Sequence, residues 1–362
     1  MKKIALVHDW FFQVAGAEKV LNAIADLFPG DTFALFKGKE AREEIKASFL
    51  NRLPFSQKLY RHLLPLYPAA IESFNLSDYD LILSSSHAVA NKVLTHSDQL
   101  HISYCHTPMR YIWDLCFDYF SSSSFSLKNL YIQHTLHRLR NWDAASHGRV
   151  DHFIANSHYI KRRIAKIYRR DAEVIYPPVD VSRFEFCEKK EDYYLTVSRL
   201  VPYKKIGLII DAFNQMPDKK LIVVGGGPLL AEYQKKAKGN IELRGHCSDA
   251  EVEVLMSKAK GFVFAAIEDF GISPIEAMAT GTPVIALGKG GTKETVIDQK
   301  TGLLFEKQQA CDIVAALSRF SSLSFDPFAI RAHAESFSKE RFDREYSDFV
   351  EKKWKEHRAK IR

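Results

Sequence analysis

Short apolar runs alternate with helical patterns along almost the whole chain, and this alternation limits the possible folds most. The first series of runs is 4–7, 80–86, 101–107 and 152–156, and a second series starts at 193–200 and includes LIVVGGG, NIELRG, GFVFAAI and TPVIALG. Residues 17–28 carry apolar side chains at the three- and four-residue spacing of a helix. Strands that alternate with helices form parallel sheets built from β-α-β units. We therefore expect an α/β fold with Rossmann-like, doubly wound sheets.

The length of the chain indicates two domains. Its 362 residues exceed one ordinary core and fit two domains of about 150 to 180 residues each. The proline-containing segment 173–184 separates the two series of strands and is expected to be the crossing. Residues 339–362 are expected to form one long helix, because Phe342, Tyr346, Phe349, Val350 and Trp354 make an apolar stripe that needs a large partner surface.

Composition is that of an ordinary globular protein, with 46% hydrophobic and 26% charged residues. The apolar run at the N-terminus spans only residues 4–7, so it predicts a strand and not a signal peptide. No run approaches the 18 or so apolar residues of a membrane-spanning helix. The five cysteines lack metal or redox spacing, which favours a reducing cytoplasm. The net charge of +7 is not concentrated in a stripe, so we expect no nucleic-acid partner.

Two segments, 55–64 and 127–142, mix basic and apolar residues. Such stretches can lie on an anionic membrane surface. The alternative is a helix that packs its apolar side on the core and leaves a basic face in water. The composition of either segment alone favours this second reading. A serine run at 121–124 is expected to form a loop near the acceptor side.

The segment 267–296 contains the most specific chemical signal. Glu268 and Glu276 stand eight positions apart around Gly271, Pro274 suits the first turn of a helix, and Gly281 suits its end. A helix N-terminus attracts anions, and a carboxylate accepts hydrogen bonds from neighbouring hydroxyls. The segment therefore predicts a site for a phosphorylated, polyhydroxylated ligand.

This segment resembles the E-x7-E region of the family 4 glycosyltransferases, and further motifs extend the resemblance over nearly the whole chain. VSRLVPYKKI (197–206), VVGGGPL (223–229) and KTGLLF (300–305) match in the second half, although Ser198 replaces the usual glycine. In the first half, HDWFFQVAGAEKVLNAI, SSSHAVA, YCHTPMRYIWD and ANSHYIKRRI resemble the branch that builds bacterial surface polysaccharides. The resemblance implies a GT-B fold: two Rossmann-like domains, 1–180 and 181–339, face a cleft, and a helix at about 340–362 crosses back to the first domain.

For the donor side, the resemblance implies that Arg199 and Lys204 neutralise the departing diphosphate and that Glu276 binds ribose hydroxyls. Glu268 is assigned to positioning and electrostatics; whether it also acts as a nucleophile in such retaining enzymes stays open. The loop that follows Glu268 is expected to contact the donor through Asp269, Phe270, Gly271 and Ile272. The Gly290-Gly291 turn is expected to offer amides to the base or the phosphates.

In the first domain, Gly16 opens a helix after the first strand and is expected to meet the diphosphate. His106 ends a strand and is expected to contact a sugar hydroxyl as a catalytic residue. The weaker candidates on the acceptor side are His8, Asp9, His87, Arg110 and Trp113. A buried core position explains Trp113 equally well.

The resemblance implies a retaining hexosyltransferase that needs a nucleotide sugar but no metal or other cofactor, since no Asp-x-Asp pair lies at the proper end of a strand. GDP-mannose is the favoured donor, and UDP- or dTDP-sugars are alternatives. The expected acceptor is a polyprenyl-diphosphate-linked or other glycan in O-antigen, capsule or exopolysaccharide synthesis. The expected location is cytoplasmic, peripheral on the anionic cytoplasmic face of the inner membrane. A non-catalytic scaffold that binds nucleotide sugars is the alternative of another class.

Overall fold

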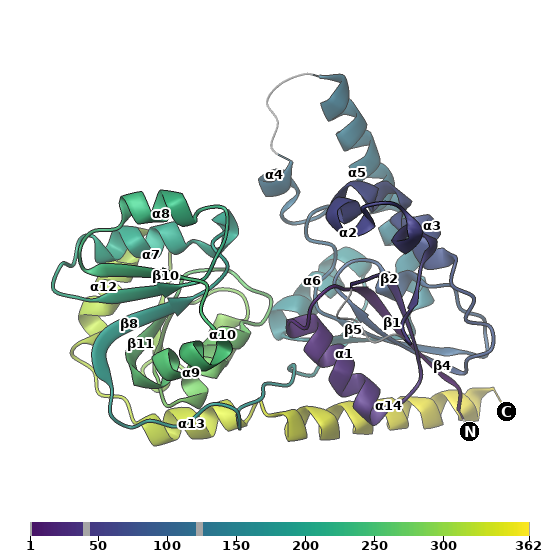
Figure 1. Ribbon diagram of the computed structural model, residues 1–362. Helices are drawn as coiled ribbons and strands as arrows, with labels where there is room; N and C mark the ends of the chain where they lie inside the picture. Colours follow the sequence, from purple (N-terminus) through teal and green to yellow (C-terminus); the bar gives the residue numbers. More distant parts are fainter. Residues whose placement is uncertain (1, 39–43, 121–125, 362) are drawn as a thin grey trace. The chain divides into compact units, whose positions relative to one another are not determined.

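The computed structural model describes residues 2–38, 44–120 and 126–361 (Figure 1). It divides into two compact units, one formed by Met1–Pro177 with Phe342–Arg362 and the other by Pro178–Arg341. The boundaries expected from the sequence lie at 180 and 339. The change of unit falls in the proline-containing segment 173–184, and the serine run at 121–124 lies outside the described residues.

Unit 1 contains a seven-stranded sheet in the order β3-β2-β1-β4-β5-β6-β7, in which all pairs are parallel. The strands are β1 (Ile4–Phe11), β2 (Asp31–Lys37), β3 (Lys46–Ala47), β4 (Leu81–Ser86), β5 (Leu100–Cys105), β6 (His152–Ala155) and β7 (Ala172–Val174). The α-helices are α1 (Gly16–Leu27), α2 (Ser56–Leu59), α3 (Tyr67–Glu72), α4 (Cys116–Tyr119), α5 (Leu127–Ser146), α6 (His158–Tyr168) and most of α14 (Lys339–Lys360). Short 3-10 helices span Phe49–Arg52, Tyr60–Leu66, Ala90–Lys92 and His147–Arg149.

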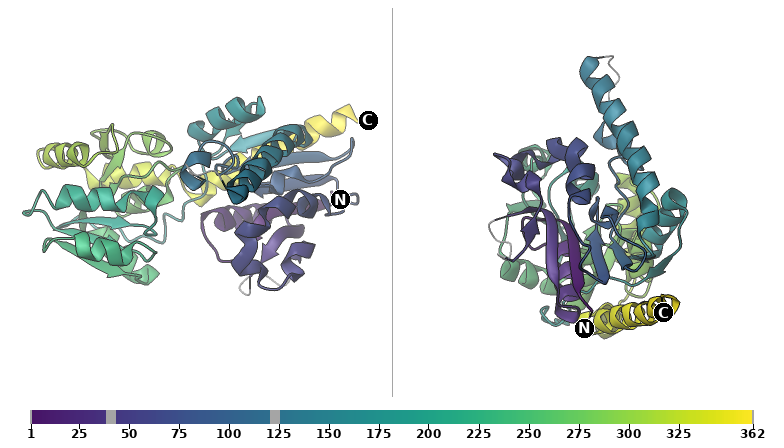
Figure 2. Two further views of the ribbon diagram at one scale, coloured as in Figure 1. Left: turned by 90° about the horizontal axis from the view of Figure 1, so that it is seen from above. Right: turned by 90° about the vertical axis from the view of Figure 1, so that its right-hand side faces the viewer.

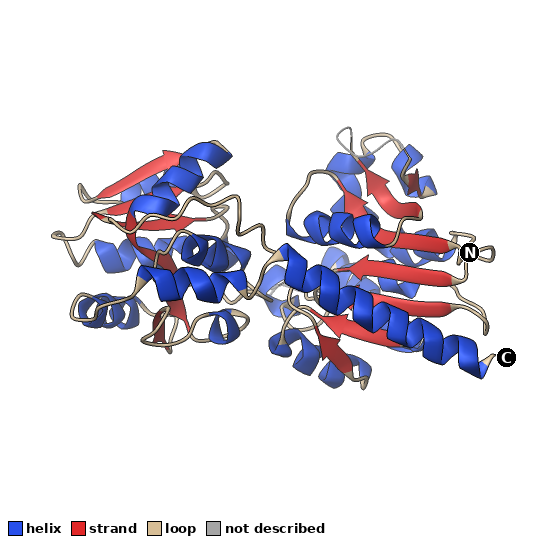
Figure 3. Ribbon diagram, turned by 90° about the horizontal axis from the view of Figure 1, so that it is seen from below, coloured by secondary structure: helices blue, strands red, loops and turns tan. Residues whose placement is uncertain are grey.

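Both faces of this sheet are buried, because successive strand side chains point to opposite sides. Ile4 and Leu6 pack in one cluster with α1 and α14, and Ala5 and Val7 pack in another with α3 and α5. Figure 3 shows α14 lying across the strands. Its stripe buries Phe342, Tyr346 and Val350 completely and leaves Phe349 and Trp354 partly buried. The C-terminal helix is thus a structural part of unit 1.

Unit 2 contains a six-stranded parallel sheet in the order β10-β9-β8-β11-β12-β13. The strands are β8 (Glu191–Val197), β9 (Leu221–Val224), β10 (Ile241–Gly245), β11 (Ala259–Phe264), β12 (Val284–Leu287) and β13 (Gly302–Phe305). The helices are a 3-10 turn at Pro202–Lys204, α7 (Ile206–Phe213), α8 (Leu230–Lys236), α9 (Asp249–Lys258), α10 (Ile272–Ala279), α11 (Thr292–Thr295), α12 (Ala310–Phe320) and α13 (Pro327–Glu335). Helices α7, α8 and α12 cover one face, and α9 and α10 cover the other (Figure 1).

Each sheet reverses its strand order at one place. In unit 1, β1 lies between β2 and β4; in unit 2, β8 lies between β9 and β11. The loops after the two strands at such a point diverge, and ligands of open α/β sheets bind in the crevice between them. The site is therefore sought after β1 and β4 and after β8 and β11.

The two basic, apolar segments differ in structure. Residues 127–142 lie in one helix, α5, whose first turns project beyond the rest of unit 1 in two views (Figures 1 and 2). Residues 55–64 are instead divided between α2 and the 3-10 helix Tyr60–Leu66, which contains Pro65. Within the described part of the chain, no helix is both long and apolar enough to cross a membrane.

The packing of α14 gives a first prediction. Phe342→Ala removes a fully buried ring, and we expect the free energy of unfolding to fall by about 3–5 kcal/mol, the usual cost of deleting a buried aromatic side chain. Lys355→Ala on the exposed side of the same helix is the matched control and is expected to change stability by less than about 0.5 kcal/mol. Urea denaturation measures both; equal effects would show that α14 is not part of the core.

Candidate functional site

The switch point of unit 2 brings together a cation and a carboxylate from two different loops. Arg199 and Lys204 follow β8, and Glu268 follows β11. The Lys204 ammonium nitrogen lies 2.7 Å from Glu268 Oε1, and the two side chains are 21% and 16% exposed. Arg199 is exposed. The groups for which separate roles are expected, charge neutralisation for Lys204 and positioning for Glu268, thus form one ion pair.

The glycine run 225–227 supports the loop that carries Arg199. Leu200 donates its N–H to the Gly226 carbonyl at 2.9 Å, and Ser198 donates to Val224 O at 3.0 Å. A β-carbon on Gly225 would lie 1.8 Å from the Ser198 carbonyl oxygen, so only glycine allows the two backbones to approach this closely. The run is a packing requirement of the site and does not have the spacing of a dinucleotide fingerprint.

A second glycine turn holds the backbone of Glu268. Gly291 donates its N–H to the Glu268 carbonyl at 2.9 Å, and a β-carbon on Gly291 would lie 2.2 Å from Phe270 O. The expectation that the Gly290-Gly291 turn offers its amides to a ligand is wrong for Gly291, because the Gly291 N–H already donates to the Glu268 carbonyl. The turn instead fixes the position of the acidic loop.

The acidic segment comprises the loop before helix α10 and the first turns of that helix. Helix α10 begins at Ile272, so Pro274 lies in its first turn, as expected, and Glu276 lies in its second turn. The Phe270 ring is buried, 5.9 Å from the ring of Phe337, so only its backbone can face a ligand. Asp269, Gly271, Ile272 and Glu276 are all partly exposed.

In unit 1, three histidines gather: His8 lies within β1, His87 follows β4 and His106 follows β5. The His8 and His87 rings lie 5.6 Å apart, and those of His87 and His106 lie 6.3 Å apart. His106 Nε2 is 2.9 Å from Ser85 Oγ, and His8 Nδ1 donates to Ser85 O at 2.7 Å. Burial and the neighbouring histidines hold the pKa of His106 well below its usual value, so its ring is neutral at pH 7.

The weaker acceptor candidates differ in exposure. His87, Arg110 and Trp113 are partly exposed, and burial lowers the pKa of His87. His8 is fully buried. Trp113 donates its indole N–H to Asp143 Oδ2 at 2.7 Å, which supports the core reading of this residue.

Asp9 is buried and positions a loop. Its two carboxylate oxygens accept the backbone N–H groups of residues 87–90 at 2.6–2.9 Å. Four hydrogen bonds to one buried charge fix the segment that begins at His87. An acceptor contact by Asp9 stays a prediction; in the structure Asp9 holds His87 in place.

Sequence reasoning did not identify Glu18, a buried carboxylate in the first turn of α1. It accepts the Ala15 N–H at 3.1 Å and lies 3.9 Å from His8 Nε2. Burial raises its pKa, but contacts with His8 outweigh this and lower it. Its place three residues into a helix is the available signal. Glu18 also puts a negative charge beside Gly16, the residue expected to meet a diphosphate.

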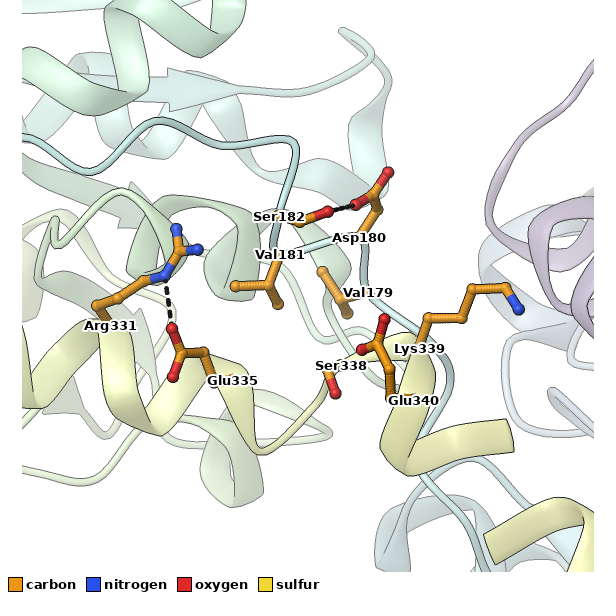
Figure 4. Close-up of a pocket in the computed structure, with 9 residues that line it drawn as sticks. All are labelled: Val179, Asp180, Val181, Ser182, Arg331, Glu335, Ser338, Lys339 and Glu340. Atoms are coloured by element: carbon orange, nitrogen blue, oxygen red, sulfur yellow. Dashed lines mark hydrogen bonds and ion pairs between the residues drawn. The ribbon is translucent and has the colours of Figure 1, made fainter. Parts of the chain in front are cut away.

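Two further features bear on ligands. Among residues 2–38, 44–120 and 126–361, no group of three or more histidine, cysteine or acidic side chains is arranged to hold a metal ion. A pocket of about 240 Å³ in unit 2 lies between residues 179–182 and the ends of α13 and α14 (Figure 4). In it Arg331 pairs with Glu335 at 3.1 Å and Ser182 bonds Asp180 at 2.8 Å. None of the expected site residues lines this pocket.

The two parallel units, each with polar residues at its switch point, define a protein of the GT-B class. The family profile described as "Glycosyltransferase Family 4" matches residues 31–183, and that described as "Glycosyl transferases group 1" matches residues 180–339. The chain belongs to the family 4 glycosyltransferases.

Curated relatives match part of this chain. O-antigen chain mannosyltransferase RfbU from Salmonella typhimurium is 36% identical over 148 residues, which is 38% of this chain and 42% of that protein. A GDP-mannose-dependent phosphatidylinositol monomannoside mannosyltransferase from Mycolicibacterium smegmatis is 31% identical over 203 residues, 47% of this chain and 52% of that protein. The chain spans about half the length of the curated relatives it matches.

Solved structures share the fold over nearly the full length. HepE from Anabaena, crystallised with UDP and glucose, is similar with a TM-score of 0.67, 18% identity and coverage of 97% of this chain and 100% of that chain. Sucrose-phosphate synthase from Thermosynechococcus elongatus gives 0.68, 18% identity and coverage of 98% and 99%.

The buried histidines predict how stability depends on pH. Burial lowers the pKa of His101 in β5 to about 4, whereas an unfolded chain has about 6.5. The unfolded state therefore binds more protons between these values. The contribution of the neutral His101 to the free energy of unfolding is complete above pH 6.5. This contribution, about 3 kcal/mol, is lost as the pH falls to 4. His101→Gln should flatten the decline in denaturant midpoint over this range, whereas His62→Gln at an exposed position should not. If the denaturant midpoint falls with pH equally steeply in the parent and in His101→Gln, the lowered pKa is wrongly assigned to His101.

Proposed function

We propose that this protein transfers a hexosyl group, with retention, from a nucleoside diphosphate sugar to a lipid-linked or oligosaccharide acceptor. The observation that carries the proposal is the meeting of Lys204 and Glu268 at 2.7 Å, next to the exposed Arg199, at the switch point of unit 2. This is where an open α/β sheet binds ligands. The family and the names of the relatives support transfer of a sugar.

The proposed donor is GDP-mannose, and the proposed pathway is bacterial surface polysaccharide synthesis. The support is the printed names of two relatives, an O-antigen mannosyltransferase and a GDP-mannose-dependent enzyme. A UDP- or dTDP-sugar donor is the alternative within the same chemistry. A scaffold without turnover is the alternative of another class, but Arg199, Lys204 and Glu276 are all present.

The proposed chemistry needs charge neutralisation and orientation. As the bond from the anomeric carbon to the diphosphate oxygen breaks, negative charge grows on that oxygen, and two cations near it lower the barrier. Arg199 and Lys204 supply them, so no metal is required. The acceptor hydroxyl attacks from the same face and loses its proton to the departing phosphate. Glu268 orients the sugar and holds Lys204 in place through the ion pair. Glu276 accepts hydrogen bonds from the ribose hydroxyls.

In unit 1, His106 and His87 are the histidines placed to meet the sugar or the acceptor. Both have some exposed surface and lie after neighbouring parallel strands. A neutral His106 can accept or donate one hydrogen bond with a sugar hydroxyl. Gly16 stays the proposed diphosphate contact of unit 1, with Glu18 as a nearby charge that opposes it.

A test of the donor site uses single substitutions. Arg199→Ala and Lys204→Ala should each reduce turnover by about 100-fold, the usual loss for one group that stabilises developing charge. Folding should change little, since Arg199 is exposed and Lys204 is only partly buried. Lys235→Ala on α8, an exposed lysine, is the matched control and should keep full activity. Near-parental turnover in both site variants would remove these residues from the mechanism.

A donor panel tests the function itself. GDP-mannose should raise the melting temperature more than UDP- or dTDP-sugars, because a ligand that binds only the folded state stabilises it. Purified protein should release GDP slowly from GDP-mannose without an acceptor, and excess EDTA should not change that rate. Binding without turnover would favour the scaffold. Loss of activity in EDTA that Mg²⁺ restores would overturn metal independence.

We further propose that unit 1 binds an anionic membrane surface through the projecting end of α5. Leu127, Leu130 and Tyr131 follow helical spacing and are 83%, 57% and 63% exposed. Lys128 and Arg138 lie on the same helix and are exposed. Exposed apolar side chains flanked by cations are the pattern of an interfacial helix. Arg140 does not belong to this surface, because it is partly buried and donates to Ile112 O at 3.0 Å.

Charge reversal tests this surface. Changing Lys128 and Arg138 to Glu should move protein from anionic vesicles to the supernatant, because attraction to anionic lipid contributes about 1 kcal/mol per basic residue. Added salt should release the parent in the same way. Reversal of Lys352 and Lys355 on α14 is the control and should leave vesicle binding intact. Equal sedimentation of the double variant and the parent would show that these residues only form a solvated face.

A further inference from the structure

A small basic pocket in unit 1 lies outside the site described above. It has a volume of about 130 Å³ and is lined by Tyr159, Arg162, Arg163, Lys166 and Ile167 of α6, together with Asp114. A single water needs only about 10–15 Å³ by the same measure, so the pocket has room for a group of several atoms. Asp114 belongs to the loop that begins at His106, which places the pocket beside the acceptor-side residues in sequence.

Helix α6 contains four basic residues and no acidic one. Lys161 pairs with Asp171 at 3.1 Å, and the buried Arg163 pairs with Asp114 and also donates to Thr107. In the part of the chain that the structure describes, Arg162 and Lys166 form no ion pair, although Arg162 stacks near the Tyr159 ring at 6.0 Å. Two of the residues that line the pocket, Arg162 and Lys166, are therefore cations without an ion-pair partner among the described residues.

These two charges lie on the same face of the helix. Residues four positions apart are neighbours on a helix surface, so Arg162 and Lys166 repel each other in the absence of an anion. The neighbouring Arg163 is buried and donates to Asp114 and Thr107. A guanidinium provides paired donors that match phosphate oxygens, and an ammonium adds a point charge. The arrangement suits a compact group with several anionic oxygens better than a single carboxylate.

We propose that the α6 pocket binds a phosphate or diphosphate group. This inference rests on the proposed function in one respect: the phosphate is taken to belong to the acceptor. The sugar end of that acceptor would then reach the neighbouring loop at His106. The pocket would select phosphate-bearing acceptors over neutral oligosaccharides. The phosphate can be presented by a lipid headgroup or by a dissolved molecule, and its recognition chemistry is the same.

Chemical protection of Lys166 tests the proposal on the intact protein. An amine-reactive ester modifies exposed lysines, and mass spectrometry reads Lys166 and Lys161 separately. Inorganic pyrophosphate should slow modification of Lys166 but not of Lys161, whose ammonium is paired with Asp171. Arg162→Gln should raise the pyrophosphate concentration for half-protection about tenfold, the effect expected on losing one charge-assisted hydrogen bond. Lys161→Gln is the matched control and should leave that concentration unchanged.

The outcomes separate the sources of phosphate and the two proposals. The measurement is repeated with phosphatidylcholine vesicles that contain or lack phosphatidic acid. If only the vesicles with phosphatidic acid protect Lys166, the bound phosphate is that of a lipid headgroup. If pyrophosphate also protects Lys166, the pocket binds dissolved phosphate compounds as well. Equal protection of Lys166 and Lys161, or an unchanged requirement in Arg162→Gln, overturns the pocket. Release of GDP from GDP-mannose is measured independently. If pyrophosphate protects Lys166 but the protein releases no GDP, the phosphate pocket is supported and the proposed function is refuted.

Discussion

Parallel pairing of every strand is the constraint on which the rest of this structure depends. In both sheets all strands point the same way, so the loops that leave their carboxyl ends gather at one edge. Polar residues far apart in the chain meet there without any direct sequence relationship. Lys204 and Glu268, 64 positions apart, approach to 2.7 Å for this reason. In unit 1, His87 after β4 and His106 after β5 approach in the same way, beside His8 within β1.

Close packing of glycines fixes the positions of the loops that carry Arg199 and Glu268. The run 225–227 lets its loop lie against the loop of Arg199, and Gly291 both contacts Phe270 and donates to Glu268 O. Larger residues at Gly225 or Gly291 would place a β-carbon inside van der Waals contact with a neighbouring carbonyl. The glycines therefore act on the site through the backbone, and their contribution to any ligand is indirect.

Unit 1 uses buried polar groups in a comparable supporting role. Asp9 is saturated by four backbone N–H groups, and Trp113 is fixed by Asp143. A buried charge is tolerated only when it is fully hydrogen-bonded. These residues therefore hold the loops of the acceptor side in place. The exposed charges of α6 and the exposed apolar residues of α5 lie outside this internal network and are available for partners.

The sequence by itself determined the α/β class, the parallel sheets and the residues after β8 and β11. These follow from local patterns, because apolar periodicity and glycine or proline positions act over a few residues. It also indicated the aromatic stripe of α14. Strand β2 (DTFALFK) was not identified.

Only the tertiary structure decided which polar residues face outward and which are used internally. Asp9 and Phe270 have side chains typical of binding sites, but packing buries them, and the partly exposed Trp113 donates its indole N–H to Asp143. Glu18 joins the histidine cluster because α1 packs beside β1, which brings its carboxylate near His8. The ion pair of Lys204 with Glu268 and the pairing of Arg163 with Asp114 likewise depend on contacts between distant segments. Local sequence specifies the backbone of each element, whereas the partner of a charged side chain is set by the packing of whole elements against one another.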